Sequence, residues 1–370
     1  MILAGWQAYS AISAGIPLEF GPMFTYYTLS VAFFMPTIGL CNSVAFNALT
    51  KAGMDTVKDF PPIRIWGTIG FICAMLFVNF AGFGGLKFQA TYMQLFASAC
   101  FSLILAGYAL TMPHCPTSKA AKGASLVDAL GLRAFKLFQR KRMAIFFIFS
   151  MLLGVSLQIT NGYANPFITS FEHIDAFKDA WAAQNANALI SLSQISETFC
   201  ILLIPFCLKR YGIKGVMLMS MFAWVFRFGF FGAGDPAGNL WMFIASCIVY
   251  GIAFDFFNVS GGLYVDKETT PDIRSSAQGL FMIMTNGLGA TIGTLCAMAV
   301  VNHFVVPTDS PEMQLAGWRT CWYIFAAYAL VVALLFLFIF KDSKHPDNDA
   351  TIAKATDTES GAAGMVEEQI

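Results

Sequence analysis

Ten long apolar stretches run through this chain, separated by short polar or Gly/Pro turns. Most approach or exceed the length of about 20 residues that an α-helix needs to cross a bilayer. They lie at 1–15, 21–48, 62–82, 91–111, 143–168, 185–207, 215–232, 239–264, 276–303 and 318–340. Because backbone groups in hydrocarbon must be hydrogen-bonded within the segment, we expect these stretches to be helices. The chain is predicted to be an all-α integral membrane protein in a lipid bilayer.

The composition excludes a soluble fold and several classes of partner. Only 12% of the residues are charged, against about 25% in soluble domains, which must cover their surface with charge. The formal net charge is zero, so no nucleic-acid partner is indicated. The nine Cys lack metal or redox spacing and form no cluster with the four His. We therefore expect no metal and no other cofactor.

The sequence also lacks the signatures of common enzymes and ATP-driven pumps. It contains no P-loop, no G-x-S-x-G elbow and no H-E-x-x-H zinc motif. We therefore expect a protein that is not an enzyme, and transport that is driven by an ion gradient.

Basic residues are concentrated in alternate loops. Residues 113–142 contain seven Lys or Arg and one acid, Asp128, whereas 169–184 contains Lys178 alone and 233–238 contains none. Short loops rich in Lys and Arg stay on the cytoplasmic side of a membrane. The loops 113–142 and 208–214 are therefore predicted to be cytoplasmic, and counting spans outward places both chain ends there as well.

The long loop 113–142 divides the chain into unequal parts. Four stretches precede it in 1–112 and six follow it in 143–340, and the polar tail 341–370 is predicted to be disordered. A helix lying at the membrane surface is predicted inside the loop. Val127, Leu130, Leu137 and Phe138 would form one apolar face of this helix. Ser125 and Asp128 resemble a capping box at its start.

The four-plus-six division resembles a six-plus-six bundle without its first two helices. The first apolar stretch opens at Met1, and no Lys or Arg precedes Lys51. It lacks the charged start of a signal peptide. We expect the sequence to be a fragment or to begin at an internal start codon.

Polar and aromatic side chains inside the stretches are the candidate functional residues. A charge at mid-bilayer costs about 2.5 kcal/mol or more, and residues three or four apart share a helix face. Sets with this spacing are Arg64, Thr68 and Phe71; Gln158 and Asn161; Gln194 and Glu197; Tyr250 and Phe254; and Asp255 and Asn258.

Each set also has a structural interpretation. Pro61 and Pro62 suit a helix start, which places Arg64 in the first turn on the cytoplasmic side, and its structural interpretation is a positively charged anchor at that surface. Amides such as Gln158 and Asn161 can join helices or recognise the hydroxyls and ring nitrogens of a solute. Rings such as Tyr250 can pack in the core or stack on a base.

Two acids are candidates for proton coupling. At about 1.5 Å per residue, Glu197 falls near mid-membrane. The cost of an ionised carboxylate there would let it gain and lose a proton as a cavity opens to alternate sides. The alternatives are an ion pair between Glu197 and Arg227, and a hydrogen bond between Asp255 and Asn258. Gly289 and Gly293, near Asn286, have the G-x-x-x-G spacing of closely packed helices.

Several of these residues lie in longer runs that resemble the bacterial nucleoside:proton symporters of the major facilitator superfamily. The runs are DFPPIRIWGTIGF at 59–71, KRMAIFFIFS at 141–150, LQITN at 157–161, SQISET at 193–198 and YGIAFDFFN at 250–258. The resemblance extends over nearly the whole chain up to the tail.

The resemblance implies a two-bundle fold of twelve helices around a central cavity, of which about ten are present here, the first matching the family's third. It implies a monomeric multi-pass carrier in the bacterial inner membrane that takes up purine and pyrimidine nucleosides with protons. It places Arg64, Thr68, Phe71, Gln158, Asn161, Gln194, Tyr250 and Phe254 at or near the nucleoside, with Glu197 and Asp255 as proton-coupling candidates. A same-fold carrier of another polar solute, such as an oligosaccharide, and a membrane-embedded enzyme or receptor remain alternatives.

Overall fold

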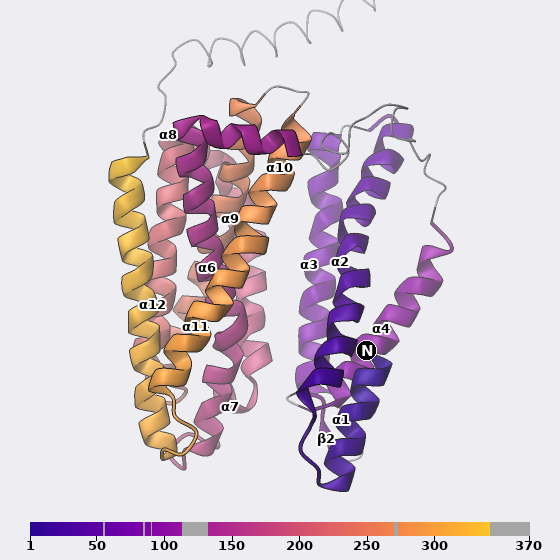
Figure 1. The fold of residues 1–370 in the computed structure, drawn as a ribbon, viewed down its shortest axis with the longest axis vertical. Coiled ribbons are helices and arrows are strands. Elements are labelled where there is room, and N and C mark those ends of the chain that lie inside the picture. Colours follow the sequence, from indigo (N-terminus) through magenta and orange to yellow (C-terminus); the bar gives the residue numbers. More distant parts are fainter. Residues whose placement is uncertain (55, 84–85, 90, 113–131, 270–272, 341–370) are drawn as a thin grey trace, which may run out of the picture.

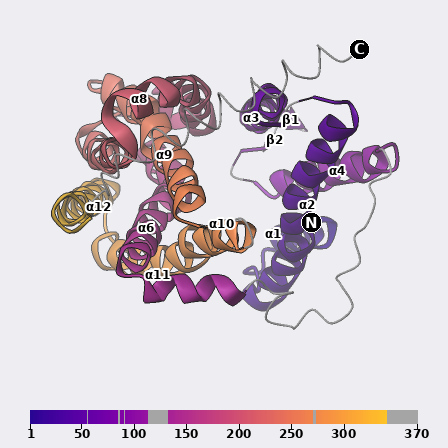
Figure 2. The same cartoon turned by 90° about the horizontal axis from the view of Figure 1, so that it is seen from above.

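The helices of this protein form two groups that stand side by side (Figures 1 and 2). The computed structural model describes residues 1–54, 56–83, 86–89, 91–112, 132–269 and 273–340. The first group contains α1 to α4, and the second contains α6 to α12. The predicted all-α fold class is confirmed for the described residues, apart from one very short hairpin.

The first group is a set of long helices with a two-stranded hairpin between the last two. Its elements are α1 (Ile2–Ala14), α2 (Phe20–Lys51), α3 (Thr56–Phe80), β1 (Gly82–Phe83), β2 (Leu86–Lys87) and α4 (Met93–Ala109). The strands are antiparallel, with Gly82 opposite Lys87. The hairpin therefore turns the chain between α3 and α4.

The second group begins with a 3₁₀ helix and continues through α6 to α12. Its elements are η1 (Leu132–Gln139), α6 (Lys141–Ser170), η2 (Phe171–His173), α7 (Trp181–Gln184), α8 (Ala186–Ala233), α9 (Leu240–Glu268), α10 (Arg274–Met282), η3 (Ile283–Gly289), α11 (Ala290–Phe304) and α12 (Pro311–Ile339). Two helical segments make up α8, joined at Gly212, where φ is 69°. A glycine accepts this left-handed conformation without the clash of a Cβ atom.

Six helical stretches among the described residues are long and apolar enough to cross a membrane. They are Lys141–His173, Ala186–Ile204, Phe206–Ala233, Leu240–Val265, Ser276–Phe304 and Pro311–Ile339. The first group adds shorter apolar helices at Ile65–Phe80 and Met93–Ala109. All ten apolar stretches predicted from the sequence lie on helices.

The start of α3 corrects one prediction. The helix begins at Thr56, so Pro61 and Pro62 lie inside it and Arg64 is beyond its first turn. A proline removes one helical N–H and crowds the preceding turn, which is why the sequence favoured a later start. The side chain of Arg64 lies outside the described residues, so its predicted role at the site stays a prediction.

The second group has a dense core of aromatic rings and close helix contacts. Phe167, Phe243 and Trp322 are fully buried within it. Glycines bring α6 against the π-helical turn η3 and α11: a Cβ atom on Gly154 would collide with the carbonyl oxygen of Thr285, and one on Gly293 would lie 2.9 Å from the Cα atom of Val155. The close packing predicted from the G-x-x-x-G spacing is therefore confirmed.

The end of the predicted linker helix packs onto the second group. Leu137 of η1 is buried, and the ring of Phe138 lies 5.3 Å from that of Phe147. Arg140 donates a hydrogen bond to the carbonyl oxygen of Glu268 at 3.1 Å. The rest of the predicted helix and cap, Val127, Leu130, Ser125 and Asp128, lies outside the described residues, as does the tail 341–370.

A compact turn precedes α9 outside the membrane-spanning stretches. The carboxylate of Asp235 accepts hydrogen bonds from the backbone N–H groups of Ala237, Gly238 and Asn239. Partial burial opposes the ionisation of Asp235, but these donors outweigh it and hold its pKa below the usual value. The ionised side chain therefore stabilises the turn that directs the chain into α9.

A polar contact joins the two groups. Asn79 of α3 is buried and donates to the side-chain oxygen of Asn185 at 2.9 Å. Its own side-chain oxygen accepts a hydrogen bond from the backbone N–H of Ala188, at the start of α8. Because both ends of the Asn79 amide are used, this contact sets the position of α3 against α8.

Candidate functional site

A cavity of about 500 Å³ lies between α3 and the helices α6, α8 and α9. Its wall combines aromatic rings, amides, hydroxyls and charged groups. The lining residues are Phe71, Met75, Thr160, Asn161, Ala164, Asn165, Asn187, Ile190, Ser193, Gln194, Glu197, Arg227, Tyr250 and Phe254. The volume and the mixed lining suit a small polar solute that has a planar part.

Six residues predicted from the sequence meet in this cavity. They come from four helices far apart in the chain: Phe71 from α3, Asn161 from α6, Gln194 and Glu197 from α8, and Tyr250 and Phe254 from α9. Residues identified by their spacing of three or four thus lie on helix faces that line the same cavity.

Three other predicted residues lie outside the lining. Thr68 is half-buried on α3, one turn before Phe71. Gln158 packs against α11, where its Cβ atom would lie 3.2 Å from a Cβ atom on Gly293. Asp255 is 6% exposed and follows Phe254 on α9. Adjacent residues on a helix point in different directions, so Asp255 sits behind the wall.

Two aromatic rings form a shared surface in the cavity wall. The rings of Tyr250 and Phe254 are stacked, with centroids 5.8 Å apart and planes 8° apart. The ring of Trp224 meets Tyr250 edge-on, at 6.0 Å and 90°. Offset parallel rings of this kind present flat faces on which a planar heterocycle can stack.

Both acidic candidates lie close to Tyr250. Glu197 is half-buried and lines the cavity. Asp255 follows Tyr250 by five residues on α9, and Glu197 lines the same cavity as Tyr250. The two acids therefore share one neighbourhood, with Glu197 on the cavity side.

Arg227 is a cavity residue that the sequence identified only as a partner for Glu197. Its guanidinium donates hydrogen bonds to Thr160 Oγ1 at 2.8 Å and to the carbonyl oxygen of Ser246 at 2.8 Å. It also lies 4.4 Å from the centre of the Tyr250 ring. The available signal was an arginine inside an apolar stretch, which is rare unless it faces a polar interior.

The sequence reasoning also missed the amides at one end of the cavity. Asn165 donates to the side-chain oxygen of Asn187, joining α6 to α8. Thr169 donates to Asn165 at 3.3 Å. Asn165 follows Asn161 by four residues, so the same spacing rule would have found it.

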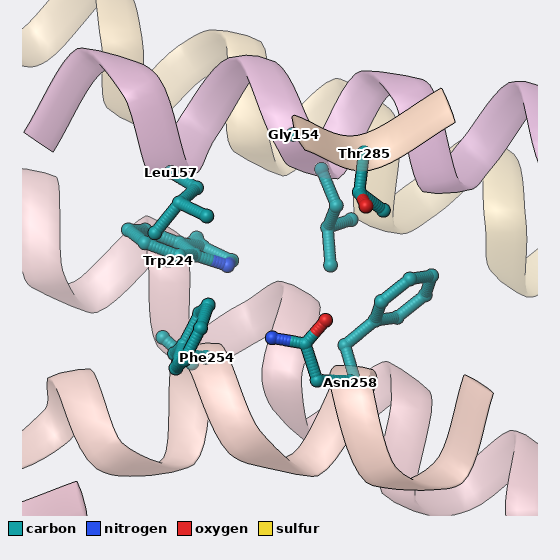
Figure 3. A pocket seen from close by; sticks show the side chains of 9 residues that line it. Gly154, Leu157, Trp224, Phe254, Asn258 and Thr285 are labelled. Carbon is teal, nitrogen blue, oxygen red and sulfur yellow. The ribbon is translucent and has the colours of Figure 1, made fainter. Parts of the chain in front are cut away.

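A second, much smaller cavity of about 20 Å³ lies inside the second group, behind the aromatic wall. Leu157, Trp224 and Phe254 close one side, and the amide of Asn258 points into the space below Gly154 and Thr285 (Figure 3). This volume holds about one water molecule. Asn258 therefore lines this small cavity and not the large one.

The chain matches, over residues 2–345, a family described as nucleoside H⁺ symporters. The chain belongs to this family. The match covers both groups of helices and every residue of the large cavity. Known proteins of the family that resemble the chain are permeases, so the prediction that it is not an enzyme is confirmed.

Two curated relatives of this symporter are permeases of Escherichia coli strain K12. The nucleoside permease NupG is 48% identical over 86% of this chain and 74% of its own length. A xanthosine permease is 46% identical over 88% of the chain and 75% of its own length. The expectation that two family helices precede Met1 stays a prediction.

Solved structures agree with the fold of this family member. A crystal structure of the nucleoside transporter NupG matches with a TM-score of 0.77 and 45% identity, over 92% of this chain and 81% of that chain. A point-mutant form of NupG matches with a TM-score of 0.81 and 44% identity, over the same shares. The chain is thus a multi-pass membrane protein with a transporter fold.

Proposed function

We propose that this protein imports nucleosides together with protons by alternating access. The observation that carries the proposal is the meeting of a stacked ring pair, amides and a carboxylate in one cavity of a nucleoside H⁺ symporter family member. Aromatic rings can stack on the base, and amides can form hydrogen bonds with the base and the ribose. A carboxylate can bind and release a proton. Purine and pyrimidine nucleosides are the proposed substrates.

Each predicted residue has a proposed role. Tyr250, Phe254 and Phe71 stack on or enclose the base, while Asn161 and Gln194 bind its polar groups or the ribose. Arg64, Thr68 and Gln158 are kept as proposed binding residues that join the site in another state of the carrier. Glu197 carries the proton, with Asp255 as the second candidate.

Transport follows from a relative motion of the two groups of helices. We divide the chain into a first bundle (1–112), a linker (113–142), a second bundle (143–340) and a tail (341–370). The bundles rock about the cavity, which opens to one side of the membrane at a time. In this scheme the carrier is a monomer in the bacterial inner membrane, with 113–142, 208–214 and both ends of this chain in the cytoplasm.

Uptake by cells tests the proposed substrate and energy source. The protein is expressed from its whole gene in cells without nucleoside uptake of their own, which are then given labelled uridine or adenosine. We expect saturable uptake that unlabelled nucleosides inhibit, that free bases, ribose and oligosaccharides do not, and that a protonophore abolishes.

Three results would contradict the proposal in different ways. Uptake of an oligosaccharide would make the protein a carrier of another solute. Nucleoside uptake that persists with a protonophore would remove proton coupling. Chemical conversion of a solute or signalling without uptake would favour an enzyme or a receptor.

A further inference from the structure

Arg227 is the only positively charged side chain among the described residues that line the cavity. It lies in the second half of α8 and is 1% exposed. Burying a charged group costs free energy unless hydrogen bonds or other electrostatic contacts, such as those with aromatic ring faces, compensate for the lost water. An arginine that only filled space in the core would destabilise the protein, so the contacts of Arg227 are the evidence for its role.

Its hydrogen bonds hold the guanidinium in one orientation. Besides Thr160 and Ser246, Arg227 donates to Ser193 Oγ at 3.4 Å. The hydroxyl of Ser246 donates back to the backbone carbonyl oxygen of Arg227 at 2.9 Å. These partners come from α6, α8 and α9, so the planar group is fixed where three helices meet.

The fixed guanidinium lies against two aromatic rings. It is 4.4 Å from the centre of the Tyr250 ring and 5.0 Å from that of Phe231. Cation–π attraction is strongest when both partners are removed from water, as they are here, because Tyr250 and Phe231 are also buried. Arg227 is therefore well placed to restrain the ring of Tyr250.

We propose that Arg227 is a positioning residue, which holds Tyr250 so that its ring shares one orientation with Phe254. The two rings then form the surface on which a planar heterocycle stacks. The identity of that heterocycle as a nucleoside base rests on the proposed function. The restraint on Tyr250 does not, because it exists in the protein without a solute.

A ligand-free experiment tests the restraint directly. 3-Fluorotyrosine is placed at position 250 alone, in the protein expressed from its whole gene, and its ¹⁹F resonance is recorded in detergent. We expect one narrow resonance in the parent and a shifted, broadened or divided one in Arg227→Met. Arg227→Lys keeps a cation beside the ring and should restore part of the parent spectrum.

Two controls separate positioning from general loosening. Arg210→Met removes a cation from a similar pair outside the cavity, where Arg210 lies 5.6 Å from the Tyr211 ring, and should leave the resonance at 250 unchanged. A label at Tyr328, whose hydroxyl donates to the carbonyl oxygen of Leu152 on α6, should not respond to Arg227→Met. An unchanged resonance at 250, or an equal change at 328, would overturn the proposal.

Uridine binding by calorimetry then measures the consequence for the site. We expect Arg227→Met to raise the Kd for uridine by several-fold and up to roughly 30-fold, because a ring released from a desolvated cation–π contact adopts the binding orientation only part of the time. In a Tyr250→Leu background the same substitution should add little, because the ring it restrains is gone. If the losses of uridine affinity caused by Arg227→Met and Tyr250→Leu were additive, the proposal would be overturned. If the parent protein bound no uridine, the proposed function would be contradicted, and the ¹⁹F result alone would decide whether Arg227 restrains Tyr250.

Discussion

The two groups of helices differ sharply in how they are packed. Between Ala134 and Phe340, large aromatic and aliphatic side chains form a continuous core. Among the described side chains of the first group, the buried apolar residues are mostly alanines, such as Ala8 and Ala97, while Phe33 is 78% exposed and Leu110 is 89% exposed. The second group therefore has a core of large packed side chains, which the described side chains of the first group lack.

The same contrast is found at the cavity. The described lining residues with charged, amide or hydroxyl-bearing side chains all lie on α6, α8 and α9, and α3 contributes only Phe71 and Met75. Asn79 connects α3 to α8 through two hydrogen bonds. Among the described lining residues, the second group therefore supplies the polar side chains, and α3 supplies an apolar wall.

The largest expected effect is the loss of proton-driven uptake when Glu197 on α8 is substituted. This result would place proton coupling in the second group. Glu197→Gln keeps the shape of the side chain but cannot ionise. We expect uptake driven by an imposed pH gradient in vesicles to be abolished, while exchange of labelled for unlabelled nucleoside continues. If the variant still accumulates nucleoside, the role passes to Asp255, for which Asp255→Asn is the matched variant.

The second largest expected effect is on thermal stability, and it compares a Gly→Ala substitution in each group of helices. Gly154→Ala forces a Cβ atom onto the carbonyl oxygen of Thr285, whereas the described structure has nothing within 4 Å of a Cβ atom on Gly107 of α4. Overpacking costs about 1–3 kcal/mol or more, so Gly154→Ala should clearly lower the thermal unfolding temperature. Gly107→Ala should leave it equal or slightly higher, since alanine favours helix by about 1 kcal/mol. Equal losses in both variants would refute the packing contrast.

A smaller effect distinguishes the two amides predicted on α6. Asn161 lines the cavity, and Gln158 packs towards Gly293. Loss of a hydrogen bond to a bound solute costs about 0.5–1.5 kcal/mol. We expect Asn161→Ala to raise the Kd for uridine by several-fold to about tenfold, and Gln158→Ala to raise it less. Parent-like binding of uridine and adenosine by both variants would make the two amides structural only.

The smallest effect concerns the contact between the groups. Asn79→Ala removes both hydrogen bonds that join α3 to α8 and should let the cavity open more often at the Asn185 end. We expect a cysteine placed at Ile190 to react a few-fold faster with a water-soluble thiol reagent. Gln184→Ala removes a bond within the second group, to the carbonyl oxygen of Lys178, and should have no such effect. Equal rates in the parent and Asn79→Ala would show that the contact does not restrain opening.

Local features of the sequence were enough to identify the helices and the residues that share a helix face. Hydropathy and three-to-four spacing are local properties, so the apolar stretches and sets such as Gln194 with Glu197 could be identified without any partner helix. The same local logic misplaced the start of α3, because Pro61 and Pro62 are tolerated inside it. A local preference is a weak guide where the surrounding structure compensates for it.

Which helix faces meet depends on how all the helices pack together. Phe71 reaches the cavity while Thr68 does not, and Gln158 turns to α11 while Asn161 faces the site. Arg227 and Tyr250 lie on consecutive helices, and only the packing of α8 against α9 places the guanidinium on the ring. The rotation of each helix depends on how the glycines and aromatic rings of all its neighbours fit together, and no local pattern in the sequence contains that information.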